Sequence, residues 1–207
     1  MENQSGAIRL SKFASGNSAL DASLVSRCKH RDAEAFALLV DRYQARVFGY
    51  VRRMLRTNED AEDVSQEVFV KVFQNIDRFD SRASFSTWLF KIASNLCIDK
   101  IRKQEKENRI EFESLDLDDT VSFEDESWNP EAHLNAKELA IAIEQSIMQL
   151  SNKLKPVLLL HDQQNLGYEE IAEILSIPIG TVKSRLFLAR EELKKTVKIF
   201  YRSEDVL

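Results

Sequence analysis

Glycine and proline are scarce in this chain of 207 residues, which contains 5 Gly and 3 Pro. Together with the abundance of helix-forming residues, this scarcity favours an all-α fold without a sheet. Cysteine is also rare: Cys28 and Cys97 lie far apart, outside any CxxC pattern and without histidine partners. We therefore expect no disulfide framework, no zinc site and no cofactor.

Long hydrophobic runs are missing as well. No apolar stretch approaches the roughly 18 residues that span a bilayer, and residues 1–20 lack the hydrophobic segment of a signal peptide. We therefore expect a cytoplasmic protein without direct membrane insertion. The apolar content of 43% suffices for one substantial core or two small ones.

The net charge of −5 is concentrated in one segment. Residues 105–131 hold 11 acidic and 2 basic side chains, whereas residues 1–104 hold 17 basic and 13 acidic ones. This acidic segment contains Pro130 and scattered apolar residues, so we expect a flexible acidic linker at 105–135. Residues 1–20 are rich in Ser, Asn, Gly and Ala and are expected to form a flexible tail.

Residues 168–193 have the pattern of two helices joined by a tight turn. The first helix, 168–175, places its apolar residues on one face and its acids on the other, and Pro178 and Gly180 are expected to end it. The second carries a narrow apolar stripe, formed by Val182, Leu186, Ala189 and Leu193. The side chains between these positions point outward, and most can reach phosphates or base edges: Lys183, Ser184, Arg185, Phe187, Leu188 and Arg190. The pattern predicts a DNA-reading helix-turn-helix rather than a structural hairpin.

Thr57, followed by an acid three residues later, is a start signal for a helix that we expect to reach about Ile76. Its inner face is apolar: Ala61, Val64, Val68, Val72 and Phe73. The opposite face is polar and acidic, with Asp60, Asp63, Gln66 and Glu67. Because neither a histidine nor a glycine-rich phosphate loop lies nearby, we expect a solvated or partner-binding face rather than a catalytic one.

The loop 77–86 carries two phenylalanines among arginines and small polar residues. Aromatic rings interleaved with arginine suit stacking on unpaired bases, so we expect Phe79 to be exposed and Phe85 to return to the core. The next helix is expected from Thr87 to about Lys103, with an apolar inner face that includes Trp88. Its outer face is basic and polar: Lys91, Ser94, Asn95, Lys100, Arg102 and Lys103.

Three strings closely resemble one family, the extracytoplasmic-function sigma factors of bacterial RNA polymerase. They are DAEDVSQEVFVKVF at 60–73, FSTWLFKIASNL at 85–96 and GYEEIAEILSIPIGTVKSRLFLAR at 167–190, in the family's order and separation. The resemblance implies a sigma-2 domain of three or four helices at 21–104 and a sigma-4 helix-turn-helix domain at 136–207. It also implies an alternative, non-catalytic sigma factor that binds core RNA polymerase, recognises promoters and promotes strand opening, in a stress or envelope response.

The resemblance also assigns roles to single residues. It implies contact with the clamp helices of the largest polymerase subunit by Asp60, Asp63, Gln66 and Glu67, and contact with the flap of the second subunit by the sigma-4 domain. It implies minus-ten DNA binding by Phe79, Arg82, Lys91 and Asn95. It implies minus-thirty-five DNA binding by Thr181, Lys183, Ser184, Arg185, Phe187 and Arg190. Leu188 stands where many relatives have a basic residue, so the minus-thirty-five preference is not predicted.

Two other functions are compatible with parts of the pattern. A stand-alone helix-turn-helix regulator would use the C-terminal half alone and leave residues 60–103 as a sensor or dimerisation domain. A metal-dependent nuclease using the acids at 60–67 lacks convergent ligands. Because no sensor domain is visible, we expect another molecule to hold the protein inactive, and the resemblance implies that this partner is an anti-sigma factor.

Overall fold

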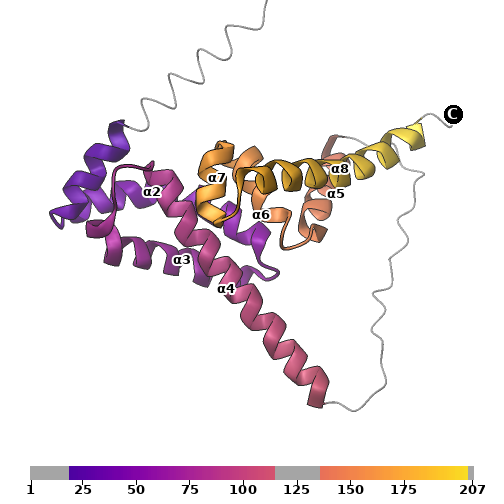
Figure 1. The fold of residues 1–207 in the computed structure, drawn as a ribbon, viewed down its shortest axis with the longest axis horizontal. Coiled ribbons are helices and arrows are strands. Elements are labelled where there is room, and N and C mark those ends of the chain that lie inside the picture. The colour runs from indigo at the N-terminus through magenta and orange to yellow at the C-terminus, as the bar shows by residue number, and fades with distance from the viewer. Residues whose placement is uncertain (1–18, 115–135, 205–207) are drawn as a thin grey trace, which may run out of the picture.

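The computed structural model describes residues 19–114 and 136–204, and its regular elements are helices (Figure 1). Within these two ranges no strand occurs, which confirms the predicted all-α class. The helices follow one another as residues 19–29, α2 (Ala33–Met54), α3 (Asn58–Asn75), η1 (Ile76–Arg78), α4 (Phe85–Ser114), α5 (Ala136–Gln149), α6 (Lys155–Leu158), η2 (Leu159–Gln163), α7 (Tyr168–Leu175) and α8 (Ile179–Glu204). Residues 1–18 of the tail expected at 1–20, and residues 115–135 of the linker expected at 105–135, lie outside the described residues, whereas residues 19–20 are helical.

Local capping explains where the first long helices begin. Asp32 begins α2 because its carboxylate accepts the backbone N–H groups of Glu34 and Ala35 at 3.0 and 3.1 Å. Thr57 begins α3 as predicted, since its Oγ1 accepts the N–H of Asp60 at 3.1 Å. These caps separate the helix at 19–29, α2 and α3, and they allow the three elements to fold back on one another.

The core of the first half lies where α2, α3 and α4 meet. Every third or fourth residue of α2 is buried, including Tyr43, Val47 and Tyr50, because this spacing keeps one face of the helix inward. The ring of Tyr50 packs edge-on against Phe90 of α4 at 5.6 Å, and its hydroxyl pairs with Ser94 Oγ at 2.7 Å. The predicted inner face of α3 is buried except for Phe73, which is 45% exposed and packs beside Phe36.

The second half contains the helix-turn-helix formed by α7 and α8. The predicted packing is confirmed: Ile171 and Ile174 of α7 are buried, as are Val182, Leu186 and Ala189 of α8, and Leu193 is partly buried. The turn differs from the prediction. Ser176 takes the left-handed conformation (φ 52°) at the C-cap of α7, whereas Gly180 lies in the first turn of α8. This conformation costs a residue other than glycine about 1–2 kcal/mol, and here the cost falls on a single position at the helix C-cap.

The two halves pack against each other. α7 lies across α4 (Figure 1), and the buried side chains of both halves form one continuous cluster. α4 continues to Ser114, so residues 105–114, expected to be linker, are helical. No helix in 19–114 or 136–204 is long and apolar enough to cross a membrane.

Candidate functional site

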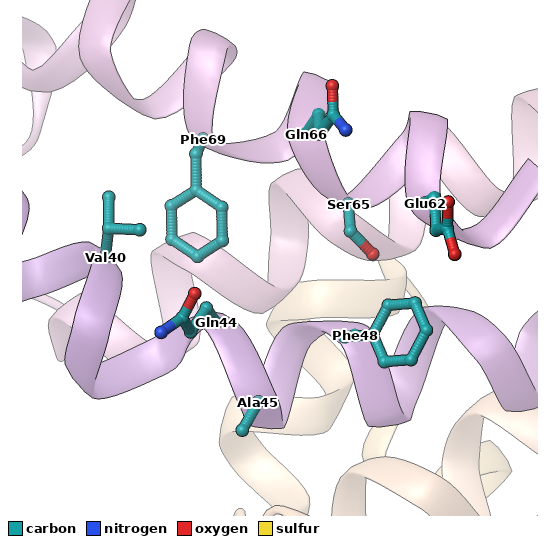
Figure 2. Close-up of a pocket in the computed structure, with 8 residues that line it drawn as sticks. All are labelled: Val40, Gln44, Ala45, Phe48, Glu62, Ser65, Gln66 and Phe69. Carbon is teal, nitrogen blue, oxygen red and sulfur yellow. The ribbon is translucent and has the colours of Figure 1, made fainter.

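A groove of about 660 Å³ lies between α2 and α3 (Figure 2). It is lined by four residues of each helix, namely Val40, Gln44, Ala45 and Phe48 from α2 and Glu62, Ser65, Gln66 and Phe69 from α3. The rings of Phe48 and Phe69 project into the space between the helices, whereas Gln66 points away from α2. Half-buried rings inside a polar rim suit the insertion of apolar side chains from a partner.

An acidic strip of α3 borders this groove and consists of Asp63, Gln66 and Glu67. All three side chains are exposed, as the sequence predicts. Glu67 forms only a long intrahelical ion pair with Lys71, 3.9 Å between Oε1 and Nζ, and such a pair contributes little. The strip is therefore free to meet a basic partner surface.

Asp60 does not belong to this strip, so the prediction of an outward-facing Asp60 is wrong. Its Oδ1 lies 2.6 Å from Lys100 Nζ, and its Oδ2 accepts from Gln104 and from the Thr57 hydroxyl, both at 2.8 Å. The hydrogen bonds from Lys100 and Thr57 lower the pKa of the Asp60 carboxyl. Asp60 thus ties the start of α3 to α4.

The loop between η1 and α4 buries its first aromatic ring, which corrects a second prediction. Phe79 is 6% exposed, and its ring lies 5.2 Å from that of Trp88 and 5.9 Å from that of Phe85. Lys29 donates to the Phe79 carbonyl at 2.8 Å and lies over the ring. Phe79 therefore anchors the loop, and its ring is not available for stacking on a base. Phe85 returns to the core as predicted.

The other residues predicted for minus-ten DNA lie at the surface. Arg82 is almost fully exposed and forms an ion pair with Asp80. Asn95 is exposed on α4. Lys91 is half-exposed, and its Nζ lies 3.8 Å from Glu173 Oε1 of α7. Its ammonium group is therefore already in contact with an acid of the second half.

The start of α7 is capped by the side chain of Glu170. The N–H of Gly167 donates to Glu170 Oε2 at 2.9 Å, and this carboxylate also lies at the positive end of the helix dipole. The next element, α8, turns its polar side outward. Lys183, Ser184 and Phe187 are exposed, Phe187 by 65%, while Thr181 and Arg185 are half-buried. Leu188 is also exposed, by 51%, and stands next to Phe187.

Two of the basic residues of α8 have partners within the second half. Lys183 lies over the ring of Tyr168, with its Nζ 5.7 Å from the centroid. Arg190 pairs with Asp162 of η2. Burial opposes ionisation of Asp162, but hydrogen bonds from Arg190 and His161 outweigh it and lower the pKa of the carboxyl. Arg190 is therefore less free for DNA than its place in the sequence indicates.

Comparisons with known proteins identify the family of this chain. A family model for Sigma-70 region 2 matches residues 39–107, and one for Sigma-70 region 4 matches residues 140–193. The chain is 37% identical to the ECF RNA polymerase sigma factor SigW of Bacillus subtilis, over 84% of this chain and 95% of SigW. It is 35% identical to the ECF RNA polymerase sigma-E factor of Escherichia coli, over 88% and 96% of the two chains.

This chain belongs to the extracytoplasmic-function sigma factors. Its fold is also that of two solved structures. CnrH, in complex with the cytosolic domain of CnrY, superposes with a TM-score of 0.63 at 22% identity, over 87% of this chain and 98% of CnrH. RpoE of Bartonella quintana, in complex with the anti-sigma factor NepR, gives 0.63 at 20% identity, over 81% and 99%. As a sigma factor, the protein binds core RNA polymerase and directs it to promoters.

In this sigma factor, region 2 corresponds to α2, α3 and most of α4, and region 4 corresponds to α5 through most of α8. The sequence did not reveal the residues that join the two regions: Arg46, Arg53, Glu144, Glu170 and Glu173. Each of these residues has its partner far away along the chain, as Glu170 has in Thr87. The spacing of residues within one helix therefore could not predict these pairs. The acidic residues of α7 are the one sign of this contact in the sequence, but the pattern predicts that they face solvent.

Proposed function

We propose that the sigma factor contacts core polymerase through the α2/α3 groove and the acidic strip. The observation that carries this proposal is an apolar groove with exposed acids at its border, on helices that the core of the first half already holds rigidly. A partner with apolar side chains flanked by basic ones would fit both features. By the family resemblance, that partner is the pair of clamp helices of the largest subunit.

The test reverses charge at Asp63 and Glu67 by Asp63→Lys/Glu67→Lys. We expect the affinity for core polymerase to fall roughly tenfold, because two border charges would then repel a basic partner. The matched control is Glu169→Lys/Glu192→Lys, which makes the same net charge change at exposed sites of α7 and α8. Equal affinity of both double variants, measured by fluorescence titration of core polymerase at moderate salt, would disprove the assignment.

Promoter DNA is proposed to meet two separate surfaces. Duplex minus-thirty-five DNA would lie against α8, where Lys183, Ser184 and Phe187 are exposed together with Leu188. The unpaired minus-ten strand would lie along the loop before α4 and the exposed side of α4, at Arg82, Lys91 and Asn95. Phe79 acts in this proposal by holding the loop in place.

We further propose an anti-sigma partner, a cytoplasmic location and a role in a stress or envelope response. RpoE of Bartonella quintana, which shares this fold, is bound by the anti-sigma factor NepR in its structure. The sigma factor would act by binding, as the initiation subunit of polymerase, and would carry no catalytic centre of its own. A stand-alone helix-turn-helix regulator is not favoured, because it leaves the region 2 match at 39–107 without a role.

A further inference from the structure

The acidic side of α7 faces the start of α4. Glu170 Oε1 accepts a hydrogen bond from the Thr87 hydroxyl and a longer one, 3.3 Å, from Ser84 Oγ. One turn further along α7, Glu173 Oε1 lies 3.8 Å from Lys91 Nζ. Two carboxylates of the second half thus lie on hydroxyl and ammonium groups of the first half.

Two arginines of α2 are held by the second half in the same way. Arg46 donates to the side-chain and backbone oxygens of Gln164 at 3.0 and 3.3 Å, while its guanidinium stacks over the rings of Tyr43 and Phe90. Arg53 Nε lies 2.8 Å from Glu144 Oε1 of α5. Four contacts along α2 and α4 therefore join the second half to the first.

A cleft of about 940 Å³ runs along this seam. Its lining includes Arg42, Arg46 and Lys29 of the first half, the serines of the loop before α4, and Glu170 of α7. Hydroxyl, ammonium and guanidinium groups of this kind bind the phosphates of a nucleic acid strand. In this structure, carboxylate and amide oxygens of the second half contact the same groups that would otherwise bind phosphates.

The duplex-reading surface is placed differently. Lys183, Ser184 and Phe187 of α8 remain exposed while α7 covers the start of α4. We call the arrangement in which α7 covers the start of α4 closed. It leaves the duplex-reading surface of α8 accessible and obstructs the strand-binding surface at the start of α4.

We propose that the second half of the free sigma factor masks the strand-binding surface of the first half, with Glu170 and Glu173 standing in for DNA phosphates. This proposal rests on the proposed function, which assigns the unpaired strand to the loop and α4. Exposed ion pairs are individually weak, so the mask is reversible and reduces single-strand affinity by the fraction of molecules that are closed. Duplex binding through α8 is unaffected by the mask.

The contact itself can be tested by zero-length carbodiimide crosslinking of the full chain, followed by peptide mass spectrometry. We expect an amide crosslink between Lys91 and Glu173 in the free protein at low concentration, with no need for a dimer. Absence of this crosslink, with the chain folded by circular dichroism, would overturn the proposal and leave the proposed function intact.

The consequence for binding is tested with Glu144→Lys/Glu173→Lys, which spares the cap that Glu170 provides to α7. The control is Asp41→Lys/Glu59→Lys, at exposed positions of α2 and α3 that form no ion pair with the second half among the described residues and lie outside α8; the net charge change is identical. The probes are fluorescent random-sequence pools of 20-nucleotide single strands and of duplexes, followed by anisotropy. We expect single-strand affinity to rise by about five- to thirty-fold over the control, the range for losing two such ion pairs, with duplex affinity equal in both variants.

Small-angle scattering of the same variants separates the two possible failures. If Glu144→Lys/Glu173→Lys expands the particle but single-strand affinity stays at the control level, the assignment of the strand to α4 is wrong, and the mask falls with it. If the particle stays compact and affinity is unchanged, these contacts do not hold the halves together and the mask alone is wrong. Expansion with the expected gain supports both.

Discussion

At the scale of single residues, Asp60 shows how a tertiary contact can override a local pattern. The spacing of acids on α3 predicts one continuous outward face, but Lys100 and Gln104 reach Asp60 from α4. A carboxyl whose pKa is lowered in the folded state stabilises the fold above its unfolded pKa, about 3.9, and that stability is lost as the pH falls through the folded pKa.

We therefore expect Asp60→Asn to lower the free energy of unfolding by about 1 kcal/mol at pH 7, since Lys100 loses its charged partner. As the pH falls through the lowered pKa of the folded state, the wild-type carboxyl becomes protonated, and the difference should shrink. Urea titrations followed by circular dichroism at pH 7 and at a series of acidic pH values down to pH 3 and below measure this. Asp99→Asn is the control, because Asp99 pairs with Arg102 at an exposed site and should be neutral. A deficit for Asp60→Asn that grows toward pH 3 would contradict the assignment.

Phe79 is the second residue whose position changes its expected role. As a loop anchor it contributes buried area against Trp88 and Phe85, whereas a stacking platform would require an exposed ring. We expect Phe79→Ala to cost about 3 kcal/mol and Phe79→Leu to cost much less, since Leu refills most of the volume.

The same pair of variants distinguishes the two roles in promoter opening. With the anchor role, Phe79→Leu should keep near wild-type permanganate reactivity of minus-ten thymines at a temperature where it is folded. A loss as severe as that of Phe79→Ala would instead indicate that the ring itself meets DNA. Run-off transcription with saturating polymerase gives the corresponding activity.

At the scale of elements, α8 carries two basic residues, Lys183 and Arg190, for which the sequence predicts the same role. Their surroundings differ in the structure. Lys183 is exposed and lies over the Tyr168 ring, whereas Arg190 pairs with Asp162, whose carboxyl is ionised more readily because of that pair. A cation already neutralised within the protein gains less from a phosphate.

We expect Lys183→Ala to reduce the slope of log affinity against log salt for duplex DNA by about one unit, and Arg190→Ala to reduce it by clearly less. Anisotropy titrations of the full chain at four salt concentrations, with one duplex selected from a random pool, provide the slopes. Equal changes for the two variants would show that Asp162 releases Arg190 to the DNA. Asp162→Asn then serves as the control, because it should make the Arg190 contribution approach that of Lys183.

Helix faces could be predicted from the sequence because their burial depends on spacing within one element. The stripes of α7 and α8, the start of α3 at Thr57 and the return of Phe85 to the core all follow from such spacing. The positions that differ, Asp60, Phe73 and Phe79, depend instead on side chains that arrive from other elements. Ser94 differs for the same reason: the sequence predicts it on the outer face of α4, but it is buried and pairs with the hydroxyl of Tyr50 from α2. Ser176 differs for a local reason, since a residue other than glycine adopts the left-handed turn.

At the scale of the whole molecule, both thiols are buried in the core. Cys28 is 4% exposed and Cys97 is 0% exposed, and burial raises the pKa of the Cys97 thiol to about 12. At pH 8 the Cys97 thiol is therefore neutral and inaccessible, and Tyr50 of the same half interacts with it electrostatically.

We expect alkylation of Cys97 at pH 8 to follow global unfolding of the first half, with a rate orders of magnitude below that of the urea-unfolded chain. Glu144→Lys/Glu173→Lys should not change this rate. Mass spectrometry after timed iodoacetamide pulses measures it. Faster alkylation in that variant would mean that separating the halves also loosens the core.

The packing of α7 on α4 has a consequence for protein engineering. A chimera that joins region 2 of this sigma factor to region 4 of another would keep α4 and exchange the helix that packs on it. In such a chimera, the grafted half would have to supply acids at the positions of Glu144, Glu170 and Glu173 to meet the hydroxyl and basic groups of α2 and α4. We expect chimeras without these acids to show higher background expression, and restoring the three acids to lower it without changing which promoters are chosen.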